Sequence, residues 1–350
     1  MKKVVFFCVI VAMVICIGCN GTSSLSATSG AVLGVLKETG RIKLKESGIF
    51  RSLIVKDGTV YGYDGSSKSI VVYAPDKKPL YYSRIGKGPG EWQENAFDLF
   101  GVTGSTIVAR EEYLNKVMIF NYDKDKNTIE FVDEFLINEG VMNNAVLHSD
   151  GKIYVSLQAG KYEFAVYDLN GNLEKQCIPV NRSIEPFSEQ GILDKMKFPI
   201  FCSNTLFTVN PLTYDIGKFT CSEKELTPNG NLTLNTIFNK KPWDINVSGT
   251  IVSAKLGMGI SAVVKFNGKL LFMVCDSDEN NVDFFQAYDD TGVFIGNYMV
   301  ENGKKVLRYL GYDESGKVYY QLGKPGILKK IFQKTDEIVI GQFEAVKPDK

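Results

Sequence analysis

The sequence predicts an all-β protein, a six-bladed β-propeller of four-stranded antiparallel blades. After residue 30, short apolar runs alternate with Gly, Asn and Asp turns, and helical periodicity is almost absent. A hairpin pattern recurs six times at a spacing close to 46 residues, and an aromatic residue follows each copy at a nearly constant offset. A short apolar segment at the N-terminus precedes these repeats and predicts export.

Residues 1–18 are expected to form a signal peptide. A basic start, Met1-Lys2-Lys3, leads into an almost unbroken apolar run that is shorter than the roughly 20 residues a membrane span needs. The sequence Cys16-Ile17-Gly18-Cys19 resembles the lipobox of bacterial lipoproteins, with Cys16 where that family usually has Leu. The resemblance implies that the Cys19 thiol is acylated and becomes the mature N-terminus. The alternative is an ordinary signal peptide with an incidental Cys.

Composition argues against several classes of partner. Lys and Arg together number 40, as do Asp and Glu, so no basic excess points to nucleic acid. Four of the seven cysteines lie beyond Cys19, and their spacing matches no zinc pattern. They are expected to be small buried hydrophobes, with a Cys202–Cys221 disulfide as the alternative that export permits. These four are Cys177, Cys202, Cys221 and Cys275.

The repeat begins with a tight polar turn followed by an apolar strand. Its second turn residues are Gly58, Ser105, Gly151, Asn204, Gly268 and Gly316. The aromatic residues that follow are Tyr73, Phe120, Tyr167, Phe219, Tyr288 and Phe332. Four strands in about 46 residues, repeated in tandem, are typical of a propeller blade, and six copies close a ring. A β-sandwich, the structural alternative, predicts no period of this length.

The chain divides into three parts. Beyond the signal, residues 19–40 are rich in Ser, Thr and Gly and are expected to be a lipidated tether. Residues 41–350 form the propeller, with insertions near 179–198 and 228–260 where the repeat interval lengthens. Residues 41–46 and 337–343 both suit the strand that closes the ring, and the sequence leaves this choice open.

One segment carries a family resemblance. Residues 84–92 read Arg-Ile-Gly-Lys-Gly-Pro-Gly-Glu-Trp. This resembles the Gly-x-Gly-Pro-Gly-Glu-aromatic signature of the six-bladed β-propeller lipoproteins of Bacteroidales type, and the repeats resemble NHL-type propellers more weakly. The resemblance implies the same fold and an envelope location, but many members of that family have no assigned activity.

The same segment is the expected ligand site. Gly-Pro-Gly makes a rigid corner, here in a link between blades, on the face where propellers usually bind ligands. The expected binding residues are Arg84, Lys87, Glu91, Trp92 and, from the second insertion, Trp243. An aromatic platform with directional charged groups suits a saccharide, peptide or protein partner. The structural alternative is that Glu91 bonds backbone N–H groups of the corner and Trp92 packs between blades.

No metal or cofactor is expected. His148 is the only histidine and is expected to be structural, which argues against a zinc hydrolase or a Ser-His-Asp triad. Asp276–Asn280 begins like a calcium loop, but Asn281 and Ala287 break the pattern, which favours a solvated acidic turn. The pairs Glu111-Glu112 and Asp133-Glu134 are expected on strands, where neighbouring side chains point to opposite faces. They are therefore poor candidates for the paired carboxylates of a glycosidase.

The leading function is therefore non-enzymatic: a lipid-anchored propeller of the cell envelope that binds a ligand or protein. The alternatives are a carbohydrate-active enzyme, a glycan lyase or hydrolase with its site at the channel mouth, and a purely structural assembly module. Asn20 and the residues after it carry no acidic cluster of the kind linked to surface export. The periplasmic side of the outer membrane is accordingly the expected location.

We predict that Cys19→Ser abolishes lipid attachment, because the substituted residue has no thiol to acylate. Fractionation should move the variant from the membrane to the soluble fraction. Incorporation of labelled lipid into Cys19→Ser would contradict the assignment.

Overall fold

A computed structural model describes most of the repeat region. The described residues are 31–94, 96–179, 198–202, 205–209, 215–221, 226–233, 244–248, 251–255, 259–275, 284–289, 292–301, 306–312, 316–322 and 335–345. Cys19, Trp243 and the turn Asp276–Asn280 lie outside them, as do residues 180–197 of the first insertion, so the expectations for these positions stay predictions.

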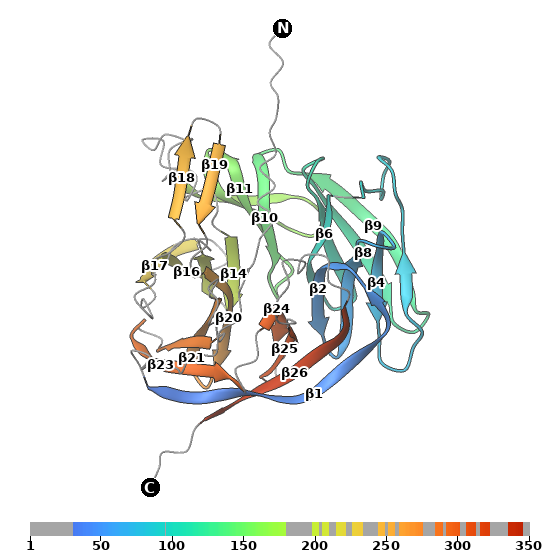
Figure 1. The fold of residues 1–350 in the computed structure, drawn as a ribbon. Helices are drawn as coiled ribbons and strands as arrows, with labels where there is room; N and C mark the ends of the chain where they lie inside the picture. Colours follow the sequence, from blue (N-terminus) through green and yellow to red (C-terminus); the bar gives the residue numbers. More distant parts are fainter. Residues whose placement is uncertain are drawn as a thin grey trace.

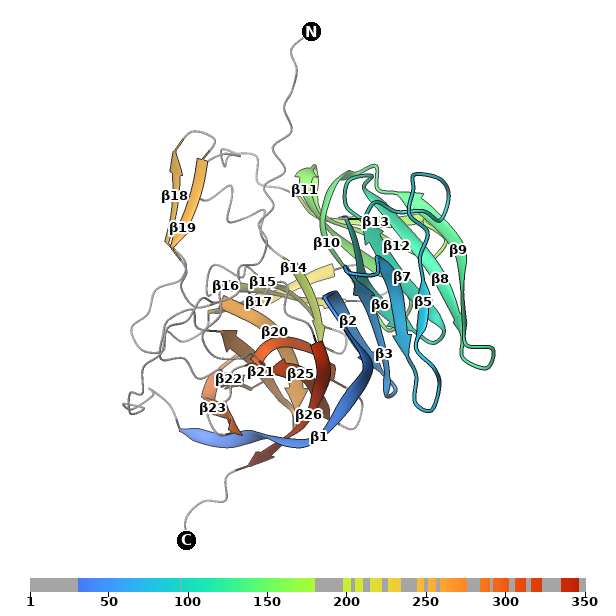
Figure 2. The same ribbon diagram turned by 45° about the vertical axis from the view of Figure 1, so that its right-hand side comes forward.

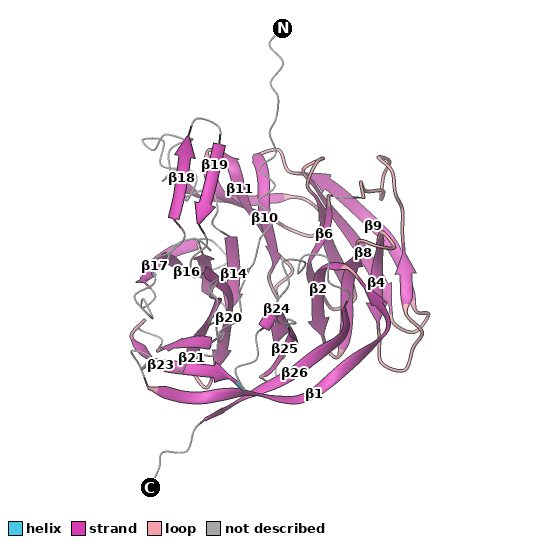
Figure 3. Cartoon of the chain, viewed as in Figure 1, coloured by secondary structure: helices cyan, strands magenta, loops and turns pink. Residues whose placement is uncertain are grey.

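Antiparallel sheets are arranged in a propeller-like ring (Figures 1 and 3). Four of them are separate four-stranded blades, whereas the sequence predicts six blades. Blade one contains β2 (Phe50–Lys56), β3 (Thr59–Asp64), β4 (Ser69–Tyr73) and β5 (Leu80–Tyr82). Blade two contains β6 (Phe97–Thr103), β7 (Thr106–Glu111), β8 (Lys116–Asp123) and β9 (Thr128–Leu136).

The next two blades follow the same plan. Blade three contains β10 (Gly140–Leu147), β11 (Ile153–Gly160), β12 (Tyr162–Tyr167) and β13 (Leu173–Pro179). Blade four contains β14 (Phe198–Cys202), β15 (Thr205–Val209), β16 (Asp215–Cys221) and β17 (Leu226–Thr233). The second insertion includes a hairpin, β18 (Asp244–Ser248) with β19 (Ile251–Lys255), that stands apart from the blades (Figures 1 and 2).

An eight-stranded sheet joins the two ends of the propeller region. Its order is β20-β21-β22-β23-β1-β26-β25-β24. The bounds are β20 (Gly259–Phe266), β21 (Lys269–Cys275), β22 (Phe284–Tyr288), β23 (Phe294–Val300), β24 (Val306–Tyr312), β25 (Lys317–Leu322), β26 (Thr335–Ala345) and β1 (Val32–Gly48). β1 is antiparallel to β26 and parallel to β23 (Figure 2).

The two segments that compete for the closing position in the sequence are thus neighbours. Residues 41–43 and 337–339 pair directly within the β1–β26 ladder. β1 begins at Val32, so residues 32–40 belong to a strand and not to the expected tether. Pairing explains the difference, because the partner strand β26 supplies hydrogen bonds that composition alone cannot reveal.

Where the structure describes them, the hairpin turns of the repeat join the strand that opens a repeat to the next strand, as between β2 and β3 or between β20 and β21. Asp57 and Gly58 both have positive φ, at 49° and 72°, and Asn267 and Gly268 match them at 47° and 74°. Such turns follow the right-handed twist of the flanking strands. The expected aromatic residues lie on the third strands, as Tyr73 on β4 and Tyr167 on β12 do. Phe332 lies outside the described residues, and the third strand there, β26, begins after it.

Strands that open the successive repeats contact one another in turn: β2 with β6, then β10, β14, β20 and β24, and β24 again with β2. Between the sheets lies an apolar core, of which the part between blades one and two includes Tyr63, Trp92, Phe97 and Phe120. Face-to-face packing of sheets thus buries side chains that a single blade would expose.

We predict that Leu36→Ala lowers the free energy of unfolding by about 2–5 kcal/mol, because this fully buried β1 side chain joins the core that includes Phe343 and Val300. Urea denaturation followed by fluorescence measures the change. Val32→Ala, at an exposed position of the same strand, should stay within about 0.5 kcal/mol of the wild type. Equal effects of the two substitutions would show that β1 does not close the ring.

Candidate functional site

The link between β5 and β6 forms a closed corner. The Trp92 amide donates to the Arg84 carbonyl and the Gly86 amide to the Trp92 carbonyl, both at 3.0 Å. The Glu91 carboxylate accepts a hydrogen bond from the Gly88 amide at 2.8 Å. Gly90 has a φ of 70°, a conformation that suits glycine. Glu91 therefore holds the corner together, as the structural alternative predicts, and this role does not require a ligand.

Side chains of blade two hold the corner in place. The Gly90 amide donates to Glu134 Oε2 at 2.9 Å, and Lys116 Nζ contacts the same oxygen at 2.9 Å. Lys116 Nζ also donates to the Glu91 carbonyl at 3.0 Å, and the Lys116 side chain is buried. Sequence reasoning missed Lys116 because its partners lie 18 and 25 residues away in the chain.

Trp92 is completely buried. Its ring stacks on Phe97 with the centroids 4.4 Å apart and meets Tyr63 and Phe120 edge to face. It cannot offer a face to a ligand, so the expectation that Trp92 is a binding platform is wrong. The physical reason is that the rigid corner turns the ring into the apolar core between blades one and two. Arg84 and Lys87, by contrast, are exposed.

An open hollow of about 350 Å³ lies beside the corner. Of the expected binding residues that the structure describes, Lys87 alone lines it. The other lining residues are Ile85, Gly86, Gln93, Glu94 and Tyr113. Tyr113 comes from the turn between β7 and β8 and is 50% exposed, and Glu94 forms an ion pair with Lys68. The hollow thus combines an aromatic ring, an amide and charges of both signs.

The β7–β8 turn that carries Tyr113 is fixed at both ends. On one side, buried Glu111 accepts a hydrogen bond from the Leu114 amide at 2.6 Å. On the other, the Asn115 side chain donates to the Ile137 and Gly140 carbonyls and accepts from the Met142 amide. These contacts tie the turn to blade three. Tyr113 is therefore presented by a preorganised segment, which lowers the entropy lost on binding.

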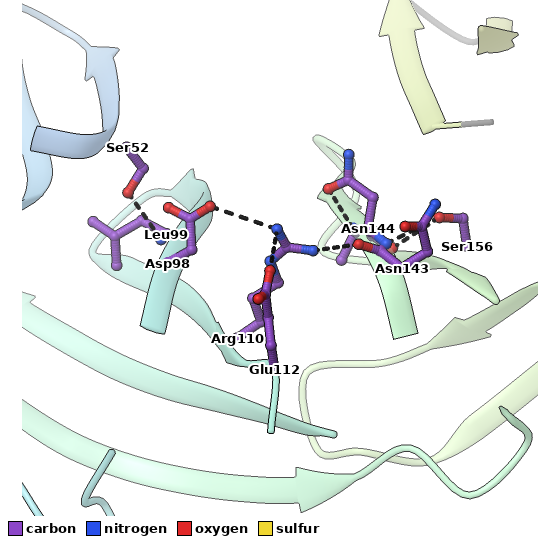
Figure 4. A network of polar contacts seen from close by, with 9 residues as sticks. Ser52, Asp98, Leu99, Arg110, Glu112, Asn143, Asn144 and Ser156 are labelled. Atoms are coloured by element: carbon purple, nitrogen blue, oxygen red, sulfur yellow. Dashed lines mark hydrogen bonds and ion pairs between the residues drawn. The ribbon is translucent and has the colours of Figure 1, made fainter. Parts of the chain in front are cut away.

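A polar network centred on Arg110 of β7 lies next to this turn and includes residues of β6 and β10 (Figure 4). Arg110 donates to the Asn143 carbonyl at 2.6 Å and contacts Glu112 at 2.9 Å and Asp98 at 3.7 Å. Its side chain is only 13% exposed. The guanidinium therefore links blade two to blade three. Sequence reasoning missed Asp98 and Arg110, although their opposite charges face each other across the first hairpin of blade two.

Several other expectations have clear outcomes. Glu111 is buried at the end of β7 (Thr106–Glu111), whereas Glu112 is about half exposed and lies in the following turn, not on the strand as expected. His148 is buried, contacts Asp150 at 2.8 Å and packs on Phe201, as expected for a structural residue. Cys221 is a free thiol, so the alternative of a Cys202–Cys221 disulfide is wrong. Cys177 is also free, and burial raises the pKa of both thiols.

Among the described residues, no group of three or more His, Cys, Asp or Glu side chains is placed to hold a metal ion. Nor do these residues contain a helix long and apolar enough to cross a membrane.

Comparison with known proteins identifies the fold. No family model matches the chain, and no curated protein matches it either. A solved structure from Bacteroides fragilis, described as an exported protein, aligns with a TM-score of 0.51 and 12% identity, over 95% of this chain and 99% of that one. This chain has a propeller-like fold.

Two enzymes align less well. A virginiamycin B lyase from Staphylococcus aureus gives a TM-score of 0.46 at 12% identity, over 87% of this chain and 98% of that one. A Bacteroides fragilis protein described as a 6-phosphogluconolactonase gives 0.42 at 16% identity, over 71% and 69%. At these identities the likeness concerns the fold alone.

We predict a pH-dependent effect of Glu111→Gln, because burial raises the pKa of this carboxyl above its ordinary value near 4.5. The stability that the protonated form contributes is complete below the unfolded pKa and is lost as pH rises through the folded pKa. The unfolding free energy of Glu111→Gln relative to wild type should therefore rise as the pH increases above about 4.5. A pH-independent difference in urea titrations, matching that of the exposed Glu130→Gln, would contradict this.

Proposed function

We propose that this chain is a ligand-binding module of the cell envelope whose site is the hollow between the Gly-Pro-Gly corner and the β7–β8 turn. The observation that carries the proposal is Tyr113, a half-exposed aromatic ring held out by a turn that Glu111 and Asn115 fix. Exposed aromatic side chains on preorganised segments are typical of binding sites. Gln93, Lys87 and Glu94 would supply directional polar contacts around it.

We also propose six blades. The eight-stranded sheet would count as two blades, β20 to β23 and β24-β25-β26-β1, joined where β1 runs parallel to β23. Six hairpin repeats and the circular order of contacts among six first strands support this count. Such a ring has no unpaired sheet edge at its junction, which limits edge-to-edge aggregation.

The family and location follow as parts of the same proposal. With six blades, a lipobox-like segment and the corner at residues 84–92, the chain fits the six-bladed β-propeller lipoproteins of Bacteroidales type. Acylated Cys19 would anchor it to the outer membrane, on the periplasmic side. Because β1 begins at Val32, residues 20–31 alone would connect the lipid to the ring. An extended chain spans at most about 3.6 Å per residue, so this short segment would keep the propeller close to the membrane.

A carbohydrate-active enzyme is the second candidate, since Asp98, Arg110, Glu112 and Tyr113 belong to the same end of blade two. Two protein carboxylates that flank one substrate can serve as acid and base when their environments differ. Here both carboxylates contact the same Arg110 nitrogen, so one cation is the partner of both. That geometry favours binding over catalysis.

We predict that Tyr113→Ala lowers ligand affinity at least tenfold, because removing the ring removes the main apolar contact surface. Labelled protein would be applied to microarrays of glycans and of peptides, with Lys87→Ala and Arg84→Ala tested alongside. Lys87→Ala should weaken the same signals, whereas Arg84 does not line the hollow and its substitution should change them less.

Tyr81→Ala is the matched control, an exposed tyrosine on outer strand β5. It should leave binding unchanged. Signals that survive Tyr113→Ala and Lys87→Ala in folded protein would place the site elsewhere. Release of shortened glycan by the wild type, but not by Glu112→Gln, would support the enzyme instead.

A further inference from the structure

We infer that the ligand is a neutral linear oligosaccharide that extends from the hollow across the β7–β8 turn to Glu112, an inference that rests on the proposed function. The hollow and Glu112 are close along the chain, because Glu112 and Tyr113 are consecutive residues of one fixed turn. Both side chains are about half exposed. An oligosaccharide that fills the hollow and stacks on Tyr113 would therefore reach Glu112, which does not line the hollow, only with the units that extend beyond it.

The backbone around the hollow argues against a peptide. Peptides commonly bind through a free strand edge, whose N–H and C=O groups pair with the peptide backbone. The walls here are turns, and the amides of Gly86, Gly88, Gly90 and Trp92 already donate within the corner or to Glu134. Recognition must then come from side chains. A sugar ring meets this condition, since it offers hydroxyl groups to polar side chains and an apolar face to an aromatic ring.

The charge around Glu112 argues against an acidic ligand. Asp98 and Glu112 share one guanidinium there, which leaves an excess of negative charge (Figure 4). A carboxylate or phosphate on the ligand would be repelled there. A neutral chain with hydroxyl donors has no such cost.

Glu112 has the free capacity that a second subsite needs. Its Oε1 contacts Arg110 at 2.9 Å, and its Oε2 takes no part in that contact. Arg110 is in turn held by the Asn143 carbonyl, so the carboxylate is fixed in position. A hydroxyl group that donates to a carboxylate forms a stronger hydrogen bond than one between neutral groups. The hollow itself, at about 350 Å³, lies at the lower limit for small-molecule sites, so a longer ligand must extend beyond it.

The test uses titration of the lipid-free mature protein with neutral gluco-, manno-, xylo- and galacto-oligosaccharides of one to six units, beside acidic glycans and unstructured peptides. Affinity should rise with chain length in at least one neutral series. Glu112→Gln should lower tetrasaccharide affinity about tenfold while leaving disaccharide affinity unchanged, because it removes the charge of the outer subsite only. Tyr113→Ala should lower both.

Glu130→Gln removes an exposed carboxylate on β9 and serves as the matched control, with no expected effect on binding. Urea midpoints establish that each variant is folded. Affinity that does not depend on chain length, or an equal loss for disaccharide and tetrasaccharide in Glu112→Gln, would overturn the inference. Tyr113-dependent binding of peptides or acidic glycans only would overturn it and leave the proposed function intact. Binding that ignores Tyr113 altogether would overturn both.

Discussion

Pairing between β1 and β26 is the interaction on which the rest of the structure depends. A ring of small sheets is stable only if its two ends meet, because an open ring exposes two faces and an unpaired edge. β1 supplies the junction by pairing with β26 on one side, while its first residues pair with the last residues of β23 on the other. The ladder with β26 extends from Gly34 to Gly48, and the Leu36 side chain packs into the apolar core beneath it.

The closed ring explains how the candidate site can be rigid although it consists of turns. The β5–β6 corner and the β7–β8 turn each contact the blade that follows. Lys116 and Glu134 of blade two hold the corner that follows blade one, and Asn115 ties the β7–β8 turn to blade three. The positions of Lys87 and Tyr113 are therefore set by contacts between blades, and a ring that opened would lose the site.

The same dependence separates the two roles of the signature segment. Glu91 and Trp92, the residues that carry the family resemblance, stabilise the corner and the core. Lys87 belongs to the same nine residues and is free to face the hollow. A motif that builds a scaffold can thus be shared while the residues around it set the ligand, which agrees with the general observation that function resides in sites placed on a fold.

Local physical rules let the sequence alone determine the strands, their turns and the repeat. Asp57-Gly58 and Asn267-Gly268 adopt the positive φ that their tight turns require, a preference encoded by the two residues themselves. What required the tertiary structure was every contact between blades. Lys116 finds its partners, Trp92 loses its exposure and Tyr113 meets Lys87 only after separate segments pack together. No local pattern encodes those distances, because they depend on how whole sheets are placed around the ring.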